Sequence, residues 1–195
     1  MQRIWIIASI VFLAFVTGCS SNNNANNRDN GEGYDFKPGV FAREDTCIVK
    51  NDTKEKVCYG DSQSEAEKVV GKGQQEGKRK YSMMYEDGIR IIYREDHVVC
   101  IGLFYESEGV YSTARGVKIG DKITNVHEAY GEEFLVYGSN NEQAFYAFDT
   151  ANWKQIMDYD QVGKAPDVIG ISIHDFDGKS GIIQIADAHY YHYAY

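Results

Sequence analysis

The four cysteines are the most reactive side chains of this chain, and their surroundings suggest different chemistry for each. Cys47 and Cys58 flank a polar stretch that is typical of a β-hairpin turning at Asp52-Thr53, which would place them directly opposite each other. Thiols in that arrangement can oxidise, so we predict a cross-strand disulfide; the alternative is that both remain reduced strand residues. Cys100 lies in the apolar run 98–101 and is expected to be an inert core thiol.

Cys19 follows a leader that has the parts of a secretory signal in their usual order. Arg3 is its only charge, and residues 4–16 form an uncharged, mostly apolar run. A membrane-spanning helix needs about 20 residues, so this run is too short to cross a bilayer but suits a signal sequence.

The next four residues, Val16-Thr17-Gly18-Cys19, resemble the lipobox of bacterial lipoproteins. The resemblance implies that residues 1–18 are a signal peptide cut before Cys19. That cysteine would then carry N-acyl and S-diacylglyceryl groups, and several acyl chains anchor a protein stably where one does not. The expected location is the bacterial cell membrane, facing outside the cytoplasm. An ordinary signal peptide or an uncleaved anchor is the alternative.

Residues 19–38 are expected to be a flexible tether. Residues 20–30 contain no apolar side chain larger than alanine, so nothing offsets the entropy of ordering them. A coil of about 20 residues has a root-mean-square reach of roughly 25 Å, enough to hold a small domain clear of lipid headgroups.

The sequence contains no pattern typical of an enzyme: no Gly-x-Ser-x-Gly, His-Glu-x-x-His, phosphate loop or Cys-x-x-Cys. We therefore expect a non-catalytic protein that needs no cofactor.

Two groups of side chains could be considered for a metal ion. Asp175-Phe176-Asp177-Gly178 is similar to part of a calcium loop, but Ile173 stands where an acid is needed, so a hairpin turn is favoured. Asp187 and His189 would share one face of a strand, whereas His192 would not. We expect no metal site.

The C-terminal run 188–195 is rich in tyrosine and is expected to continue a final strand. An exposed strip of Tyr190, Tyr191, Tyr193 and Tyr195 would suit a protein or glycan partner. In the alternative, alternate tyrosines fill the core while the others cover the outer side of the sheet.

Two short helices that recur at an offset of 60 are expected to position these groups. Each follows a Gly-Asp pair, Gly60-Asp61 or Gly120-Asp121, and ends at a glycine, Gly71 or Gly131. The first has a capping-box pattern at Ser62 and Glu65, and the second has Asp121 near its cap.

Strands are expected after each helix. The strands after the first helix are expected at 81–85, 89–93 and 97–104. Those after the second are expected at 134–137, 144–148, 153–159, 168–174 and 181–190. The sequence thus predicts an α+β protein of two tandem units, 39–110 and 111–195, in one globular body, each unit a short helix followed by an antiparallel meander.

This helix-then-meander arrangement resembles the tandem repeats of the beta-lactamase inhibitor protein and of the small envelope lipoproteins related to SmpA/OmlA. The match rests on 59–71 with 81–104, and on 117–131 with the strands after it. The resemblance implies a binding or inhibitor-like role.

A formal net charge of -9 argues against nucleic acid as a partner. We expect a lipid-anchored interaction protein of the cell envelope, with an envelope protein as its partner. The alternative is a lipoprotein that binds a small ligand or cell-wall glycan.

Overall fold

The computed structural model describes residues 34–79, 81–136, 143–164 and 167–193. These residues form an α+β fold of antiparallel strands and few helices, which confirms the predicted fold class. Tyr34–Tyr195 is one compact unit. The leader 1–18, Cys19 and the rest of the chain up to residue 33 lie outside the described residues.

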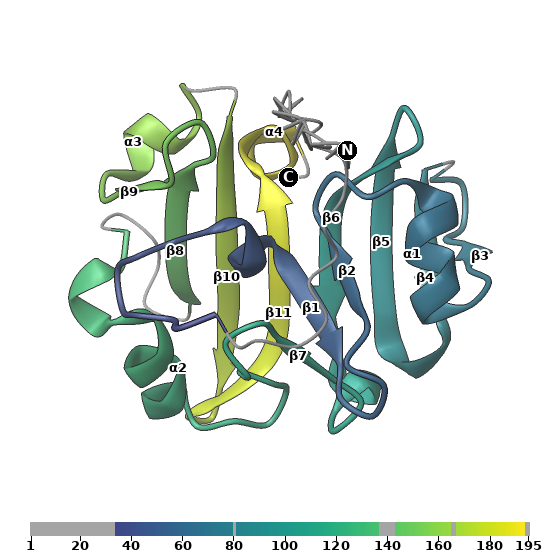
Figure 1. Ribbon diagram of the computed structural model, residues 1–195, viewed down its shortest axis with the longest axis horizontal. Helices are drawn as coiled ribbons and strands as arrows, with labels where there is room; N and C mark the ends of the chain where they lie inside the picture. The colour runs from purple at the N-terminus through teal and green to yellow at the C-terminus, as the bar shows by residue number, and fades with distance from the viewer. Residues whose placement is uncertain (1–33, 80, 137–142, 165–166, 194–195) are drawn as a thin grey trace, which may run out of the picture. The chain divides into compact units, whose positions relative to one another are not determined.

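An eight-stranded sheet with the order β3-β4-β5-β6-β11-β10-β8-β9 is the main layer (Figure 1). Its strands are β3 (Gln74–Gln75), β4 (Ser82–Tyr85), β5 (Ile89–Arg94), β6 (His97–Leu103), β8 (Gln143–Asp149), β9 (Lys154–Ile156), β10 (Val168–Phe176) and β11 (Lys179–Asp187). The sequence predicted a meander after each helix, and the pairing of β6 with β11 joins the strands of both into one sheet. The strand predicted at 134–137 is not present in its described part, where η4 (Glu132–Phe134) ends instead.

One face of this sheet, the inner face, is covered by a small sheet and two helices. The small sheet has the order β2-β1-β7. Its strands are β1 (Cys47–Lys50), β2 (Lys56–Cys58) and β7 (Tyr111–Thr113), and the helices are α1 (Gln63–Val70) and α2 (Ile123–Tyr130). Ile48, Ala66 and Val126 from this layer share a buried cluster with Ile91 and Ile171 of the large sheet. Burial of this apolar surface is the main force that holds the two layers together.

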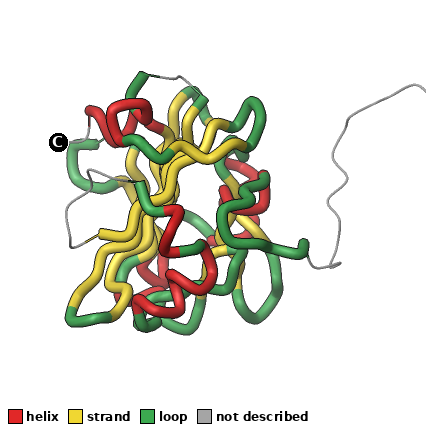
Figure 2. The backbone as a smooth tube through the Cα atoms, turned by 90° about the vertical axis from the view of Figure 1, so that its left-hand side faces the viewer, coloured by secondary structure: helices red, strands yellow, loops and turns green. Residues whose placement is uncertain are grey.

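The opposite face, the outer face, is partly covered by two short helices. These are α3 (Tyr159–Val162) and α4 (Ala188–Tyr193), whose Val162 and Ala188 are buried with Phe145 and Ala147 of β8. Figure 2 shows the strands of the large sheet behind one another, with helices on both sides of them.

The hairpin of β1 and β2 places Cys47 opposite Cys58, in the predicted register. The connection is longer than the predicted two-residue turn, because residues 51–54 form it and Lys54 takes a positive φ. A disulfide joins the two cysteines. Cys100 of β6 is a buried free thiol.

Each Gly-Asp pair forms the same corner before its helix. Gly60 and Gly120 both have φ +85, a conformation that glycine adopts without strain. In each corner a backbone N–H three residues earlier donates to the aspartate: Cys58 N to Asp61 Oδ2 at 2.8 Å, and Lys118 N to Asp121 Oδ2 at 3.0 Å. Each glycine N–H donates to the large sheet: Gly60 N to Val98 O at 2.9 Å, and Gly120 N to Ser180 O at 2.8 Å.

The β5–β6 and β10–β11 hairpins correspond at an offset of 82. A register shift lies after Ile92 in the first hairpin and after His174 in the second. Both turns are built from two residues with positive φ: Glu95 and Asp96 in the first, Asp177 and Gly178 in the second.

The pairing of β6 with β11 relates these hairpins by a local two-fold axis. Gly102 pairs with Gln184, which stands at the corresponding position of the other hairpin. The pairs on either side, Ile101 with Ile185 and Leu103 with Ile183, exchange under the same operation. A residue at one end of the outer face therefore has a counterpart at the other end.

The two helices differ in their caps, and this difference can be measured. Ser62 accepts from Glu65 N, and the Glu65 carboxylate accepts from Ser62 N, so the predicted capping box is present. The equivalent cap of α2 is Lys122, which makes no side-chain cap bond, because a lysine side chain has no acceptor for a backbone N–H. Ser62→Ala should therefore lower the free energy of unfolding by about 1 kcal/mol. Lys122→Ala, the matched control, should change it by less than about 0.5 kcal/mol in urea titrations followed by circular dichroism. Equal losses in the two variants would contradict the assignment.

Candidate interaction site

The C-terminal tyrosines do not continue a strand, which corrects the sequence-based prediction. β11 ends at Asp187, and Ala188–Tyr193 is the helix α4. The Asp187 carboxylate accepts from Tyr190 N at 2.9 Å, and this cap ends the strand and begins the helix. The described part of the run 188–195 is therefore a helix, and Tyr190 lies on that helix rather than on a strand. The side chains of Tyr191 and Tyr193, and all of Tyr195, lie outside the described part of the chain.

Asp187 closes one end of the outer face. Its carboxylate is buried, and it accepts from Arg94 Nη1 at 2.8 Å and from the Tyr59 hydroxyl at 3.3 Å. Burial, with the nearby Asp187 charge, raises the pKa of Tyr59 to about 12, so this hydroxyl remains a donor at neutral pH. The cluster holds the start of α4 against the sheet, and this role is structural.

The two residues that correspond to Arg94 and Asp187 at the other end are Phe176 and Tyr105. We call them the aromatic pair. Their ring centroids lie 6.3 Å apart, and the side chains are exposed by 48% and 59%, respectively. Where one end of the outer face has an ion pair with a buried carboxylate, the other end therefore has two half-exposed rings in contact.

Gly181 makes room for the aromatic pair. A Cβ at this position would lie 2.1 Å from the Phe176 ring and 3.0 Å from the Tyr105 hydroxyl. Real Cβ atoms do not approach other atoms as closely as the first of these distances, so the Phe176 ring rests directly on the strand backbone.

A second aromatic contact extends along the outer face from the pair. The ring of Phe104 lies 3.1 Å from where a Cβ of Gly102 would be, and the Arg90 guanidinium lies 5.0 Å from the centre of this ring. Arg90 Nη2 also donates to the Tyr190 hydroxyl at 3.4 Å. Phe104, Arg90 and Tyr190 of α4 are thus linked to one another.

Acidic residues are neighbours of the aromatic pair in the sequence and in an adjoining turn. The turn η2 (Glu86–Gly88) packs against η3 (Tyr105–Ser107), since a Cβ on Gly88 would lie 2.7 Å from Glu106 Cβ. We call the neighbouring acids the acidic rim: Glu86, Asp87, Glu106, Asp175 and Asp177. Among the described residues, none of the five takes part in an ion pair. Lys179 is the cation in the same hairpin as Asp177.

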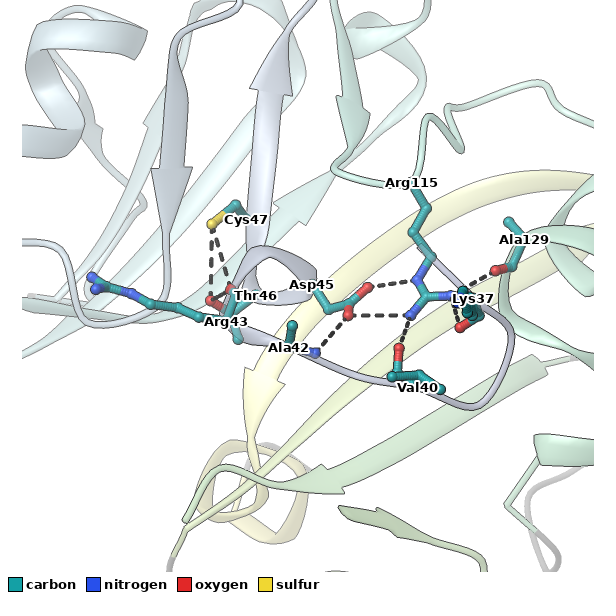
Figure 3. A network of polar contacts seen from close by, with 9 residues as sticks. All are labelled: Lys37, Val40, Ala42, Arg43, Asp45, Thr46, Cys47, Arg115 and Ala129. Carbon is teal, nitrogen blue, oxygen red and sulfur yellow. Dashed lines mark hydrogen bonds and ion pairs between the residues drawn. The ribbon is translucent and has the colours of Figure 1, made fainter. Parts of the chain in front are cut away.

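A separate polar network fastens the N-terminal segment (Figure 3). The side chains of Arg115 and Asp45 are 1% and 0% exposed, and Arg115 Nε donates to Asp45 Oδ1 at 2.6 Å. The other four guanidinium N–H groups donate to Asp45 Oδ2 and to three backbone carbonyls, those of Lys37, Val40 and Ala129. The guanidinium also lies over three aromatic rings: Phe36, Phe41 and Tyr130.

This network corrects one boundary expected from the sequence. Lys37, placed in the tether 19–38, forms a bridge with Val40 and is bound by Arg115, so residues 34–38 belong to the folded body. Arg115 is fully bonded and enclosed, which leaves it no free donor for a ligand. Its function is structural.

The remaining candidates for reactive chemistry do not form a site. Burial raises the pKa of the Cys100 thiol to about 12, so the thiol is not a nucleophile at neutral pH. Within the described part of the chain, there is no group of three or more His, Cys, Asp or Glu side chains that could hold a metal ion. None of the described helices is long and apolar enough to cross a membrane.

Comparison with protein-family models, curated proteins and solved structures finds no match for this chain. Function must therefore be argued from the leader sequence and from the geometry of the outer face.

Tyr105 and Phe176 were not predicted from the sequence. Phe176 stands between two aspartates directly before a turn, and Tyr105 follows the end of a strand. An apolar residue between acids at a turn was a signal of exposure, because a turn at a sheet end faces solvent. The tyrosine-rich C-terminus was the stronger compositional signal and was preferred.

Proposed function

We propose that this chain is a lipid-anchored, non-catalytic interaction protein of the bacterial cell envelope. The observation that carries the interaction role is the aromatic pair, because two exposed rings in contact are typical of a binding surface. The lipid on Cys19 is supported by the lipobox-like sequence 16–19. The Cys47–Cys58 disulfide supports a location outside the cytoplasm, where disulfides persist.

The fold in this proposal consists of two tandem units, 39–110 and 111–195. The equal Gly-Asp corners, the corresponding register shifts and the two-fold pairing of Gly102 with Gln184 support it. The second unit departs from a simple meander, because β9 pairs on the far side of β8 and α3 precedes the return to β10. The resemblance to inhibitor-like repeat proteins is consistent with a binding role.

The anchor can be tested by fractionating cells. Cys19→Ser should move most of the protein from the membrane pellet to the soluble fraction, because no acyl chain can then be attached. Ser21→Ala, the control, leaves 16–19 intact and should remain in the pellet. Detergent-dependent extraction of the Cys19→Ser protein would contradict the proposal.

A second candidate function, binding of a small polar ligand or cell-wall glycan, is favoured by an open pocket of about 360 Å³ beside β9 and α3. Its lining includes Asn152, Lys154, Gln155 and Lys164, which could bind hydroxyl and carboxylate groups. Thermal-shift measurements with soluble cell-wall fragments distinguish glycan binding from the protein-interaction function. A shift that is lost in a Lys154→Ala, Lys164→Ala variant would favour the glycan.

A further inference from the structure

We propose that the aromatic pair and the acidic rim bind a short helical segment of a partner protein, with apolar side chains on one face and lysine or arginine beside them. The inference rests on the proposed interaction function and adds the binding surface and the chemistry of the partner.

At the other end of the outer face, the position that corresponds to the aromatic pair is followed by a helix. There the counterparts of the aromatic pair, Arg94 and Asp187, form an ion pair on which α4 begins, and α4 packs on β10 and β11. After Tyr105 the chain forms only the short turn η3 and then leaves for β7. The Asp187 side chain is therefore buried where α4 begins, whereas its counterpart Tyr105 is 59% exposed and begins only a short turn.

The exposed position offers apolar surface to a partner. The side chains of Tyr105 and Phe176 are exposed by 59% and 48%, respectively. A partner side chain placed against the rings would bury this exposed apolar surface. Because Gly181 has no side chain, the Phe176 ring rests against the strand backbone and in contact with Tyr105, so the two rings support each other. Aromatic side chains that lose little entropy on binding are favoured anchors. Two rings suit one or two apolar side chains of a short segment rather than a large domain.

The charge around the aromatic pair selects a basic segment. The acidic rim has five carboxylates, whereas the cations beside it are Lys179 and Lys122, which is bridged to Lys179. The whole chain has a formal net charge of -9. Lysine or arginine beside the apolar anchors would complement this rim and speed association. Anionic lipid headgroups would be repelled by the same rim, so a membrane surface is the wrong occupant.

The test uses the full mature protein in detergent and two fluorescent helical peptides of Leu, Trp and Ala, one with lysine and one with glutamate on its flanks. We expect the lysine peptide to bind at least tenfold more tightly than the glutamate peptide in anisotropy titrations. Its affinity should fall as salt is raised from about 50 to 500 mM, because salt screens exposed charges. Equal affinity for the two peptides would overturn the inference.

Variants locate the binding. Tyr105→Ser with Phe176→Ser should weaken binding of the lysine peptide at least tenfold. Tyr81→Ser, at a residue of 58% exposure outside the aromatic pair and the acidic rim, should leave binding unchanged. Thermal melts establish that each variant is folded. Unchanged binding by the folded double variant would overturn the inference.

A photo-crosslinker in intact cells distinguishes this inference from the proposed function. With the crosslinker at position 105, and position 81 as the control, a specific protein adduct at 105 supports the surface. An adduct at 105 to a protein that presents no basic apolar segment would overturn the partner chemistry and leave the interaction function standing. Adducts at neither position would count against the proposed function itself.

Discussion

Arg115→Ala should lower the free energy of unfolding by about 3–5 kcal/mol, because it would leave the Asp45 carboxylate buried without its partner. The substitution also leaves the carbonyls of Lys37, Val40 and Ala129 without their donor. These groups lie on two separate segments, 34–46 and α2, so the loss is not confined to one turn. Urea unfolding followed by circular dichroism measures the change.

A second variant separates charge from packing. Arg115→Met with Asp45→Asn removes both charges and keeps most of the volume, so it should be less destabilised than Arg115→Ala. Limited proteolysis of Arg115→Ala should cut residues 34–46 faster than in the original protein, since this segment depends on the guanidinium. A loss below about 1 kcal/mol in Arg115→Ala would show that the network does not hold the N-terminal segment.

Removing the disulfide should have the next largest effect on stability. The Cys47–Cys58 bridge closes a loop with a sequence separation of 11, for which chain entropy gives roughly 2–3 kcal/mol. Cys47→Ala with Cys58→Ala should therefore lower the midpoint of thermal unfolding by about 5–10 °C. Reduction of the original protein should produce a shift of similar size.

The double variant also serves as its own control. It retains Cys100, a buried free thiol, so added reductant should leave its midpoint unchanged. A midpoint in the double variant equal to that of the oxidised protein would mean that the bridge does not stabilise the fold.

Features governed by local sequence were predictable. The capping box of Ser62 and Glu65, the closing glycines and the Cys47–Cys58 register all follow from residues near one another in the chain. The turn at Asp177-Gly178 likewise carries its own signal, because glycine and aspartate accept positive φ. Short-range geometry limits these segments to few conformations.

Features that depend on contacts between distant segments were not predictable. Nothing near Arg115 indicates that Asp45, far earlier in the chain, will bind its guanidinium. The pairing of β6 with β11 is likewise non-local, and it determines which residues are counterparts across the outer face. At the C-terminus, the strand preference of tyrosine was overridden by the helix cap at Asp187.

The candidate site also depends on contacts between distant segments rather than on local sequence. The number of tyrosines at the C-terminus indicated an interaction surface there. The two exposed rings in contact instead belong to a turn and to a strand end. Only the two-fold relation of the hairpins shows that Tyr105 and Phe176 stand where Asp187 and Arg94 stand at the other end. The proposed binding surface therefore depends on a non-local relation that the sequence alone does not reveal.

The proposed role outside the cytoplasm depends on acylation of Cys19. The most direct measurement is mass spectrometry of the N-terminal peptide from protein extracted from cell membranes. We expect a peptide that begins at Cys19 and carries a diacylglyceryl group. A peptide that still contains Met1, or an unmodified thiol at position 19, would contradict it.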